Sequence, residues 1–430
     1  MTRMLIKGGR VIDPSQMLDR LTHVLVEDGR VVSLTDEVPQ GLDEVVDATD
    51  RLVFPGFVDI GVELREPGYE EDETIASGTR AAVAGGYTCV ACLPNTDPPI
   101  DSQASVEFIQ QQAARAGHCT VVVLACVSKN LQGVELSEMG MLAEAGAVGF
   151  SDASLPVSNP DLMRRALEYS QMFNRPIIDR PESLELNRDG VMHEGWMATL
   201  LGLPGMPAEA EDVMTARDIR LVESTGGRLH LLHISSSGSV EMLRRAKARG
   251  VRVTAGIAIA NVSLSDESLR SFDSNCKVNP PLRSGEHMEA CIEGLRDGTL
   301  DVISSGHTPR AAEKKMDVLD AAPHGMTGLE TTLGLVGTKL VKPGWLDWMQ
   351  VVAKLSTNPA RILGLSQKGT LRPGADADVT IVDPHAAWVV EKQRFYSRSV
   401  NTPFIGWTLH GRVTDVVVGG VSRQRDGVRT

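Results

Sequence analysis

The feature that most constrains the fold is a regular alternation of apolar, strand-like runs with helical patterns between residues 55 and 365. Helical patterns such as those over 101–117 and 161–173 separate the runs. We expect strands at 56–64, 87–93, 120–127, 147–150, 175–179, 228–235, 251–257 and 301–305. Strands this apolar are covered on both faces, and alternation with helices indicates βα units. Eight such units predict an α/β fold of the TIM-barrel type, with its site at the C-terminal ends of the strands.

The two ends of the chain have a different texture, with short strands joined by turns that contain glycine. These patterns occupy residues 3–53 and 369–420. Because chain termini often lie close together, we expect both ends to pair into one small β-sandwich. The predicted organisation is a composite β-sandwich over 1–54 and 368–430, and a (β/α)8 barrel over 55–367.

The charge of the chain excludes several classes of partner. Its 43 Lys and Arg stand against 56 Asp and Glu, and the net charge of −13 repels phosphate backbones and anionic membranes. Aromatic residues make up only 4%, too few for platforms on which nucleic-acid bases stack. The start of the chain has no apolar signal region, and no run approaches the roughly 18 apolar residues of a membrane span. We predict a cytoplasmic protein that binds neither nucleic acid nor membranes.

The six cysteines do not indicate a disulfide framework in a chain of 430 residues. Cys89 and Cys92 have the C-x-x-C spacing of redox and zinc sites. They lie inside an apolar run that is typical of a buried strand, and no second cysteine pair completes a zinc site. We interpret all six as reduced thiols of the core.

The first expected barrel strand carries polar residues in its C-terminal half. Side chains alternate along a strand, so one face is expected to present Asp59, Gly61, Glu63 and Arg65. The other face is expected to present Val58, Ile60, Val62 and Leu64. The whole segment reads PGFVDIGVELREPG over 55–68.

This segment resembles the corresponding segment of the dihydroorotases, a branch of the cyclic amidohydrolases. Further segments match the family in order: CLPNTDPP at 92–99, GVMHEG at 190–195, LHIS at 232–235, NPPLR at 279–283, GMTGLET at 325–331, STNPARILGL at 356–365 and GTLRPGADADVTIVDP at 369–384. The resemblance covers essentially the whole chain. It implies a (β/α)8 barrel with a flanking β-sandwich.

The resemblance also implies a centre of one or two zinc ions, but most of its ligand positions carry other residues. Those positions hold Gly61, Glu63, Ala153, Arg180 and Gly306, and only His233 is retained. Glycine and alanine offer no donor atom, and arginine is a permanent cation without a lone pair. The missing Asp at position 306 removes the general base as well. We therefore expect no metal or other cofactor and no hydrolytic activity, as in a pseudoenzyme.

Part of the family's substrate-binding frame is still present. The matching positions are Arg65, Asn95, Asn279, His307 and Gly325. An arginine beside an asparagine suits a carboxylate through charge-assisted hydrogen bonds. Alternatively, Arg65 pairs with an internal carboxylate such as Glu63 or Glu66. We also expect Glu63 and Arg180 to lie close together, because a lone buried charge is costly.

Inactive dihydroorotase-like chains are known as non-catalytic subunits of bacterial aspartate carbamoyltransferase, and this sequence resembles them. We therefore predict assembly with an aspartate carbamoyltransferase catalytic chain in a large hetero-oligomer of pyrimidine biosynthesis, with contacts between copies of this chain. Two alternatives stay open. One is an active dihydroorotase- or hydantoinase-like enzyme with a metal site relocated to Glu63, His233 and Asp152. The other is a sensor of a pyrimidine intermediate that uses Arg65 and Asn95.

Overall fold

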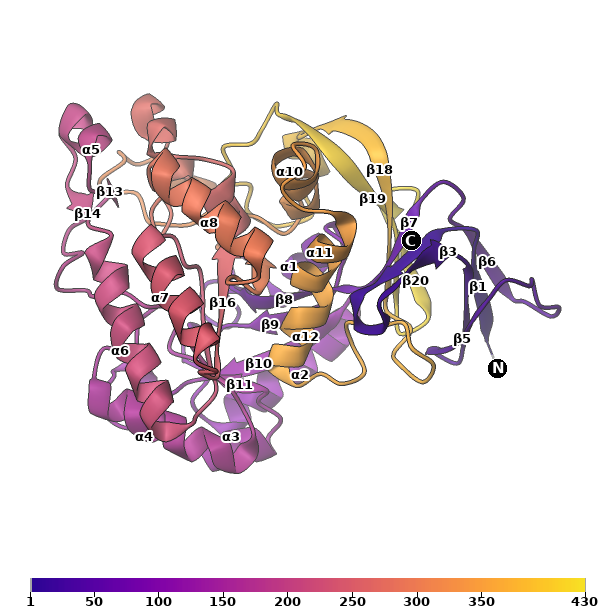
Figure 1. The fold of residues 1–430 in the computed structure, drawn as a ribbon, viewed down its shortest axis with the longest axis horizontal. Coiled ribbons are helices and arrows are strands. Elements are labelled where there is room, and N and C mark those ends of the chain that lie inside the picture. The colour runs from indigo at the N-terminus through magenta and orange to yellow at the C-terminus, as the bar shows by residue number, and fades with distance from the viewer. Residues whose placement is uncertain (1, 430) are drawn as a thin grey trace.

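The computed structural model describes residues 2–429, and within them eight parallel strands form a nearly closed barrel (Figure 1). The strands are β8 (Phe57–Val62), β9 (Tyr87–Cys92), β10 (Thr120–Ala125), β11 (Gly149–Phe150), β12 (Ile177–Asp179), β15 (Leu229–Leu231), β16 (Val253–Ala258) and β17 (Val302–Ser304). The sheet order is β17-β16-β15-β12-β11-β10-β9-β8, and its two end strands contact each other. The predicted barrel and its eight strands are confirmed.

Helices follow the strands and cover the outside of the barrel (Figure 1). They are α1 (Ile75–Ala84), α2 (Gln103–Ala116), α3 (Met139–Glu144), α4 (Pro160–Ser170), α5 (Trp196–Leu201), α6 (Glu209–Thr225), α7 (Ser237–Ala248), α8 (Gly285–Asp297), α9 (Ala312–Lys315), α10 (Thr332–Val336), α11 (Trp348–Val352) and α12 (Asn358–Leu363). Local sequence sets their ends. Helix α2, for example, starts at a capping box between Ser102 and Ser105 and ends at Gly117, which adopts a left-handed φ of 65°. Within residues 2–429, none of the helices combines the length and apolar character that a membrane span requires.

The ends of the chain together form two further sheets that pack on each other. The first has the order β21-β20-β19-β18-β7-β2-β3, and the second β5-β4-β1-β6. The strands are β1 (Arg3–Lys7), β2 (Arg10–Asp13), β3 (Leu18–Leu21), β4 (His23–Glu27), β5 (Arg30–Thr35), β6 (Glu44–Asp47), β7 (Leu52–Pro55), β18 (Val379–Val389), β19 (Thr408–Val418), β20 (Val421–Arg425) and β21 (Val428–Arg429).

Strand β7 connects the two ends of the chain within one sheet. It pairs in parallel with β2 and antiparallel with β18, so that Val53 lies between Val11 and Ile381. One apolar cluster between the sheets contains Met4 and Ile6 from the N-terminal end together with residues of β18 and β19. The predicted composite β-sandwich is confirmed, whereas the domain boundaries at 54/55 and 367/368 stay predictions. A separate short pair, β13 (Met192–His193) with β14 (Gly205–Met206), lies outside the barrel sheet.

The two cysteines of the C-x-x-C pair lie on opposite faces of β9. Cys89 packs in the cluster inside the barrel, and Cys92 packs in the cluster between strands and helices. Burial raises the pKa of each thiol to about 12. Since the two sulfur atoms face different clusters, they cannot share a metal ion. All six cysteines are buried and free, which confirms their interpretation as core thiols.

The first barrel strand departs from simple alternation. A bulge interrupts the pairing of β8 with β9 between Asp59 and Val62. Before the bulge, Val58 and Ile60 pack in the cluster inside the barrel. After it, Val62 packs in the other cluster, which includes residues of α1 and α2. The prediction that residues 58, 60, 62 and 64 share one face is wrong, because the extra residue of a bulge reverses the alternation.

Candidate active site

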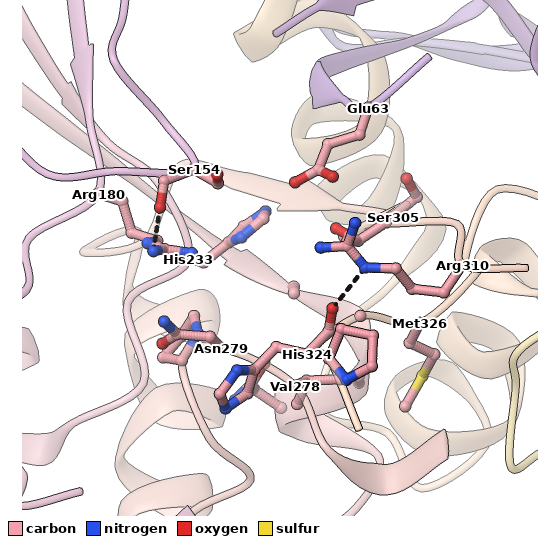
Figure 2. Close-up of a pocket in the computed structure, with 18 residues that line it drawn as sticks. Glu63, Ser154, Arg180, His233, Val278, Asn279, Ser305, Arg310, His324 and Met326 are labelled. Carbon is pink, nitrogen blue, oxygen red and sulfur yellow. Dashed lines mark hydrogen bonds between the residues drawn. The ribbon is translucent and has the colours of Figure 1, made fainter. Parts of the chain in front are cut away.

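A cavity of about 320 Å3 opens at the C-terminal ends of the barrel strands (Figure 2). Its lining includes residues within two positions of the ends of several strands: Glu63 after β8, Arg180 after β12, His233 after β15, and Ser305 with Gly306 after β17. Bringing residues from well-separated strands to one edge is how a barrel of this type builds a site. The location predicted from the sequence therefore holds a cavity lined by polar and charged side chains.

Glu63 and Arg180 both line this cavity, but each is neutralised by a different partner. Glu63 forms an ion pair with Arg65, and both residues are 5% exposed. Arg180 Nη2 lies 2.9 Å from Glu182 Oε2, and the same nitrogen donates to the Ser154 carbonyl. Within residues 2–429 no ion pair joins Glu63 to Arg180. The two residues share one cavity, but they do not compensate each other's charge as expected, because each finds an opposite charge two residues further along its own strand end.

His233 is the one retained member of the implied ligand set, and it occupies the middle of the cavity. Burial, followed by the charge of Arg180, lowers the pKa of its imidazole to about 4, so the ring is neutral at pH 7. Its Nε2 is buried and has no hydrogen-bond partner among residues 2–429. Its φ of 54° lies in the left-handed region, which is rare outside glycine and concentrates at functional sites.

The other implied ligand positions do not form a metal centre. A Cβ on Gly61 would contact the Leu232 side chain at 3.4 Å, and Ala153 is buried in the apolar cluster inside the barrel. Gly306 has a φ of 61° and no side chain to contribute. Within residues 2–429, no group of three or more His, Cys, Asp or Glu could hold a metal ion. The residues present therefore do not fit the zinc centre that the resemblance implies.

Asp152, the remaining candidate ligand of a relocated metal site, is hydrogen-bonded to the loop after β10. Its Oδ1 accepts from the backbone nitrogens of Val127 at 2.8 Å and Ser128 at 3.0 Å, and its Oδ2 accepts from Ser128 Oγ at 2.5 Å. Burial raises the pKa of this carboxyl, although the hydrogen bonds oppose the rise. The side chain fixes the loop after β10. It does not join Glu63 and His233 at the cavity.

Two of the five predicted substrate-binding residues line the cavity. Gly325 does so with a φ of 144°. Asn279 does so with its Nδ2 donating to Glu182 at 3.0 and 3.1 Å. These two bonds hold the carboxylate that also neutralises Arg180. Asn279 therefore positions the charged wall of the cavity through Glu182.

The other three predicted residues do not line the cavity. Arg65 is taken up by Glu63, which was the alternative expected for it. Asn95 lies outside the lining, with a buried Nδ2 that has no partner among residues 2–429. His307 is buried, with its Nε2 3.5 Å from Glu73 Oε2. Burial alone would raise the pKa of Glu73, but the neighbouring His307 and hydrogen bonds from two serines lower it.

The lining residues that were not predicted as part of the site include two with ionisable side chains, Arg310 and His324. Arg310 Nε donates to the His324 carbonyl at 2.9 Å, while its Nη1 is 3.6 Å from Asp72 Oδ2 (Figure 2). Burial, together with nearby cations, lowers the pKa of the His324 imidazole to about 3, so this ring is also neutral. Both residues lie on the long connection after β17. No spacing or motif in that connection marks them.

The chain is similar to known proteins along almost its whole length. A family model described as dihydro-orotase-like matches residues 50–239, and one described as amidohydrolase family matches residues 337–423. A putative dihydroorotase of Rhodopirellula baltica is 48% identical over 97% of this chain and 92% of its own length. A dihydroorotase of Pelotomaculum thermopropionicum is 48% identical over 99% of both chains. Among solved structures, an L-hydantoinase from Arthrobacter aurescens covers 100% of this chain and 98% of its own, with a TM-score of 0.90 at 23% identity.

These relatives contradict the prediction that the chain is not an enzyme. Proteins named dihydroorotase are 45–48% identical to it over almost its entire length, which points to an enzyme. The missing zinc ligands argue only against chemistry that needs those ligands. They do not show that the chain lacks every catalytic activity. By its full-length identity to these relatives, the chain belongs to the dihydroorotase-like family of amidohydrolases.

Proposed function

We propose that the protein is an amidohydrolase that acts on a small cyclic amide carrying an acidic group, of the dihydroorotate class. The observation that carries this proposal is the neutral, unpartnered His233 Nε2 between two arginines in the cavity. The names of the relatives that are 45–48% identical support the choice of substrate class.

The cavity is suited to an anionic ligand. Figure 2 shows Arg180 and Arg310 on opposite sides of it, with His233 between them. Arg180 Nε is buried without a hydrogen-bond partner among residues 2–429, and Arg310 has only a loose ionic contact with Asp72 at 3.6 Å. Guanidinium groups bind carboxylates strongly through paired hydrogen bonds. A ligand with one carboxylate and one amide carbonyl can accept further hydrogen bonds from both guanidinium groups, which an uncharged ring can do only through its carbonyls.

The proposed chemistry uses only groups of this chain. Opening a cyclic amide adds water to the carbonyl carbon and breaks the carbon–nitrogen bond, with the water's protons ending on the acid and the ring nitrogen. His233, being neutral, can accept a proton from water, and a guanidinium can stabilise the oxyanion. No step is assigned to a metal, since the residues do not fit one. A base with a pKa of about 4 is far from its optimum at pH 7, so slow turnover is expected.

The test is an assay of dihydroorotate ring opening and closing, with the two acids separated by chromatography. The variant is His233→Asn, and the matched control is His230→Asn, a buried histidine of β15 outside the cavity lining. We expect turnover that resists a chelator, is lost in His233→Asn and persists in His230→Asn. No turnover in either direction, with or without added zinc, would refute the proposed function. Loss of turnover on chelation would refute the metal-free chemistry.

Association with an aspartate carbamoyltransferase catalytic chain is a separate proposal, supported by the sequence resemblance alone. It does not require an inactive chain. Sedimentation of the two chains, mixed and apart, tests it. A new, larger species in the mixture is expected, and its absence at micromolar concentrations would remove the proposal. Contacts between copies of this chain and a cytoplasmic location also stay predictions.

A further inference from the structure

A row of arginines lies at the other end of the barrel from the candidate active site, where the strands begin. Arg228 and Arg252 directly precede β15 and β16, and Arg175 stands two residues before β12. These three strands are neighbours in the sheet, with Ile177 opposite Leu229 and Leu229 opposite Val253. Because the starts of parallel strands share one edge of the sheet, the three arginines lie along that edge.

The positive charge of this row has no counter-charge in the part of the chain that the structure describes. None of the three arginines forms an ion pair among residues 2–429, although the chain carries a net charge of −13. Arg228 donates to the carbonyls of Asn174 at 3.0 Å and Ile362 at 2.9 Å, and Arg252 to that of Gly226 at 3.0 Å. Burial first, and then the charges of Arg252 and Arg175, lowers the pKa of Arg228. Arg175 Nε is buried without a hydrogen-bond partner among residues 2–429.

A hollow of about 400 Å3 adjoins the row at the C-terminal end of α12. Gly364 belongs to its lining, and Arg175 Nη1 lies 3.9 Å from the position that a Cβ on Gly364 would occupy. Arg361 and Arg372 line it as well, and they donate to Asn358 Oδ1 at 3.2 Å and to the Ser366 carbonyl at 2.8 Å. Neither of these two arginines meets a carboxylate among residues 2–429. The row and the hollow thus form one region of unneutralised guanidinium groups.

We propose that this region, the basal arginine site formed by Arg175, Arg228, Arg361 and Arg372, binds a small ligand that carries phosphate groups. Its cations are arginines, whose planar forks match phosphate oxygens in pairs. A phosphate group presents three or four acceptor oxygens and can engage several forks at once, whereas a carboxylate presents two. A hollow of about 400 Å3 lies within the size range of small-molecule sites. The site is separate from the proposed reaction, which takes place at the other end of the strands.

The probes are inorganic phosphate and tripolyphosphate, compared with chloride at equal ionic strength, with binding followed by calorimetry and by the thermal unfolding midpoint. We expect saturable binding of tripolyphosphate. Arg175→Gln and Arg361→Gln should each weaken it by about tenfold or more, which corresponds to the loss of one charge-assisted hydrogen bond. Arg361 is exposed, so its variant is expected to fold even if Arg175→Gln does not. The matched control is Arg164→Gln, an exposed arginine of α4 paired with Glu168 at 3.1 Å.

Three outcomes would overturn the proposal. One is a response to tripolyphosphate no greater than the response to chloride. Another is weaker binding in Arg180→Gln but not in Arg361→Gln, which would assign the anion to the candidate active site. The third is tighter binding of a polyglutamate peptide than of tripolyphosphate, which would indicate an acidic protein partner.

Discussion

Replacing Glu63 by glutamine is expected to destabilise the protein more than removing both charges of its ion pair. Glu63 and Arg65 are each 5% exposed, so the single change leaves the Arg65 cation buried without its partner. Removing one partner of a buried pair costs about 3–5 kcal/mol, whereas replacing the whole pair by apolar groups is often neutral or stabilising. Glu63 borders the cavity, where water can approach. We therefore expect Glu63→Gln to lower the free energy of unfolding by about 3 kcal/mol, the lower end of this range.

The measurement is a double-mutant cycle by urea unfolding, with Glu63→Gln, Arg65→Met and the combined variant followed by tryptophan fluorescence and circular dichroism. The double variant should recover most of the loss. Methionine keeps an L side chain at residue 65, where φ is 61°, so backbone strain stays constant. Glu168→Gln, which breaks an exposed pair on α4, is the control and should change little. The claim that the pair is buried and coupled is wrong if Glu63→Gln lowers the free energy of unfolding no more than this control does. It is also wrong if the losses in the two single variants add up to the loss in the double variant.

Three further predictions concern the cavity. The pKa of His233 is about 4 in the folded protein and 6.5 in a free imidazole, so the unfolded state binds more protons below pH 6.5 and stability falls by up to about 3 kcal/mol toward pH 4. Urea midpoints of His233→Asn should therefore depend less on acid than those of the parent, and equal slopes would contradict this. Arg180→Gln should weaken dihydroorotate binding about tenfold or more by calorimetry, and unchanged affinity would remove Arg180 from the ligand site. Gly61→His combined with Glu63→His should gain no chelator-sensitive turnover of dihydroorotate, because positions 153, 180 and 306 still lack a metal donor or a base; turnover that is lost on chelation would contradict this.

The barrel and the sandwich could be predicted because both are recorded in local patterns. Each barrel strand is an apolar run between turn residues, and β7 and β18 show the same texture at opposite ends of the chain. The bulge in β8 has no such local pattern. The sequence FVDIGV is equally compatible with a regular strand and with a bulged one. Its presence depends on how β8 meets β9, which is a property of the closed barrel.

The position of the site could be predicted from the sequence, but the ion pairs within it could not. The ends of the strands bring Glu63, Arg180 and His233 to one cavity, as the order of motifs indicated. Which carboxylate each arginine meets depends on side-chain direction at the strand ends, and there Glu63 meets Arg65 while Arg180 meets Glu182. The step from missing zinc ligands to a missing activity went further than residue types allow. A motif shows which donors are absent and is silent about the chemistry open to the groups that remain.

The position of β7 also bears on how the chain is made. Its partner β18 begins at Val379, so 323 residues, 56–378, separate the end of β7 from the strand that completes its sheet. At the ribosome's pace of about 5–20 residues per second, that interval lasts roughly 16–65 s. The sheet of β1, β4, β5 and β6 needs only the first 47 residues, so it can form while the barrel is still being synthesised. During that interval β7 offers an unpaired edge to any neighbouring nascent chain, and a ribosome-bound chaperone would protect the protein best between the emergence of these two strands.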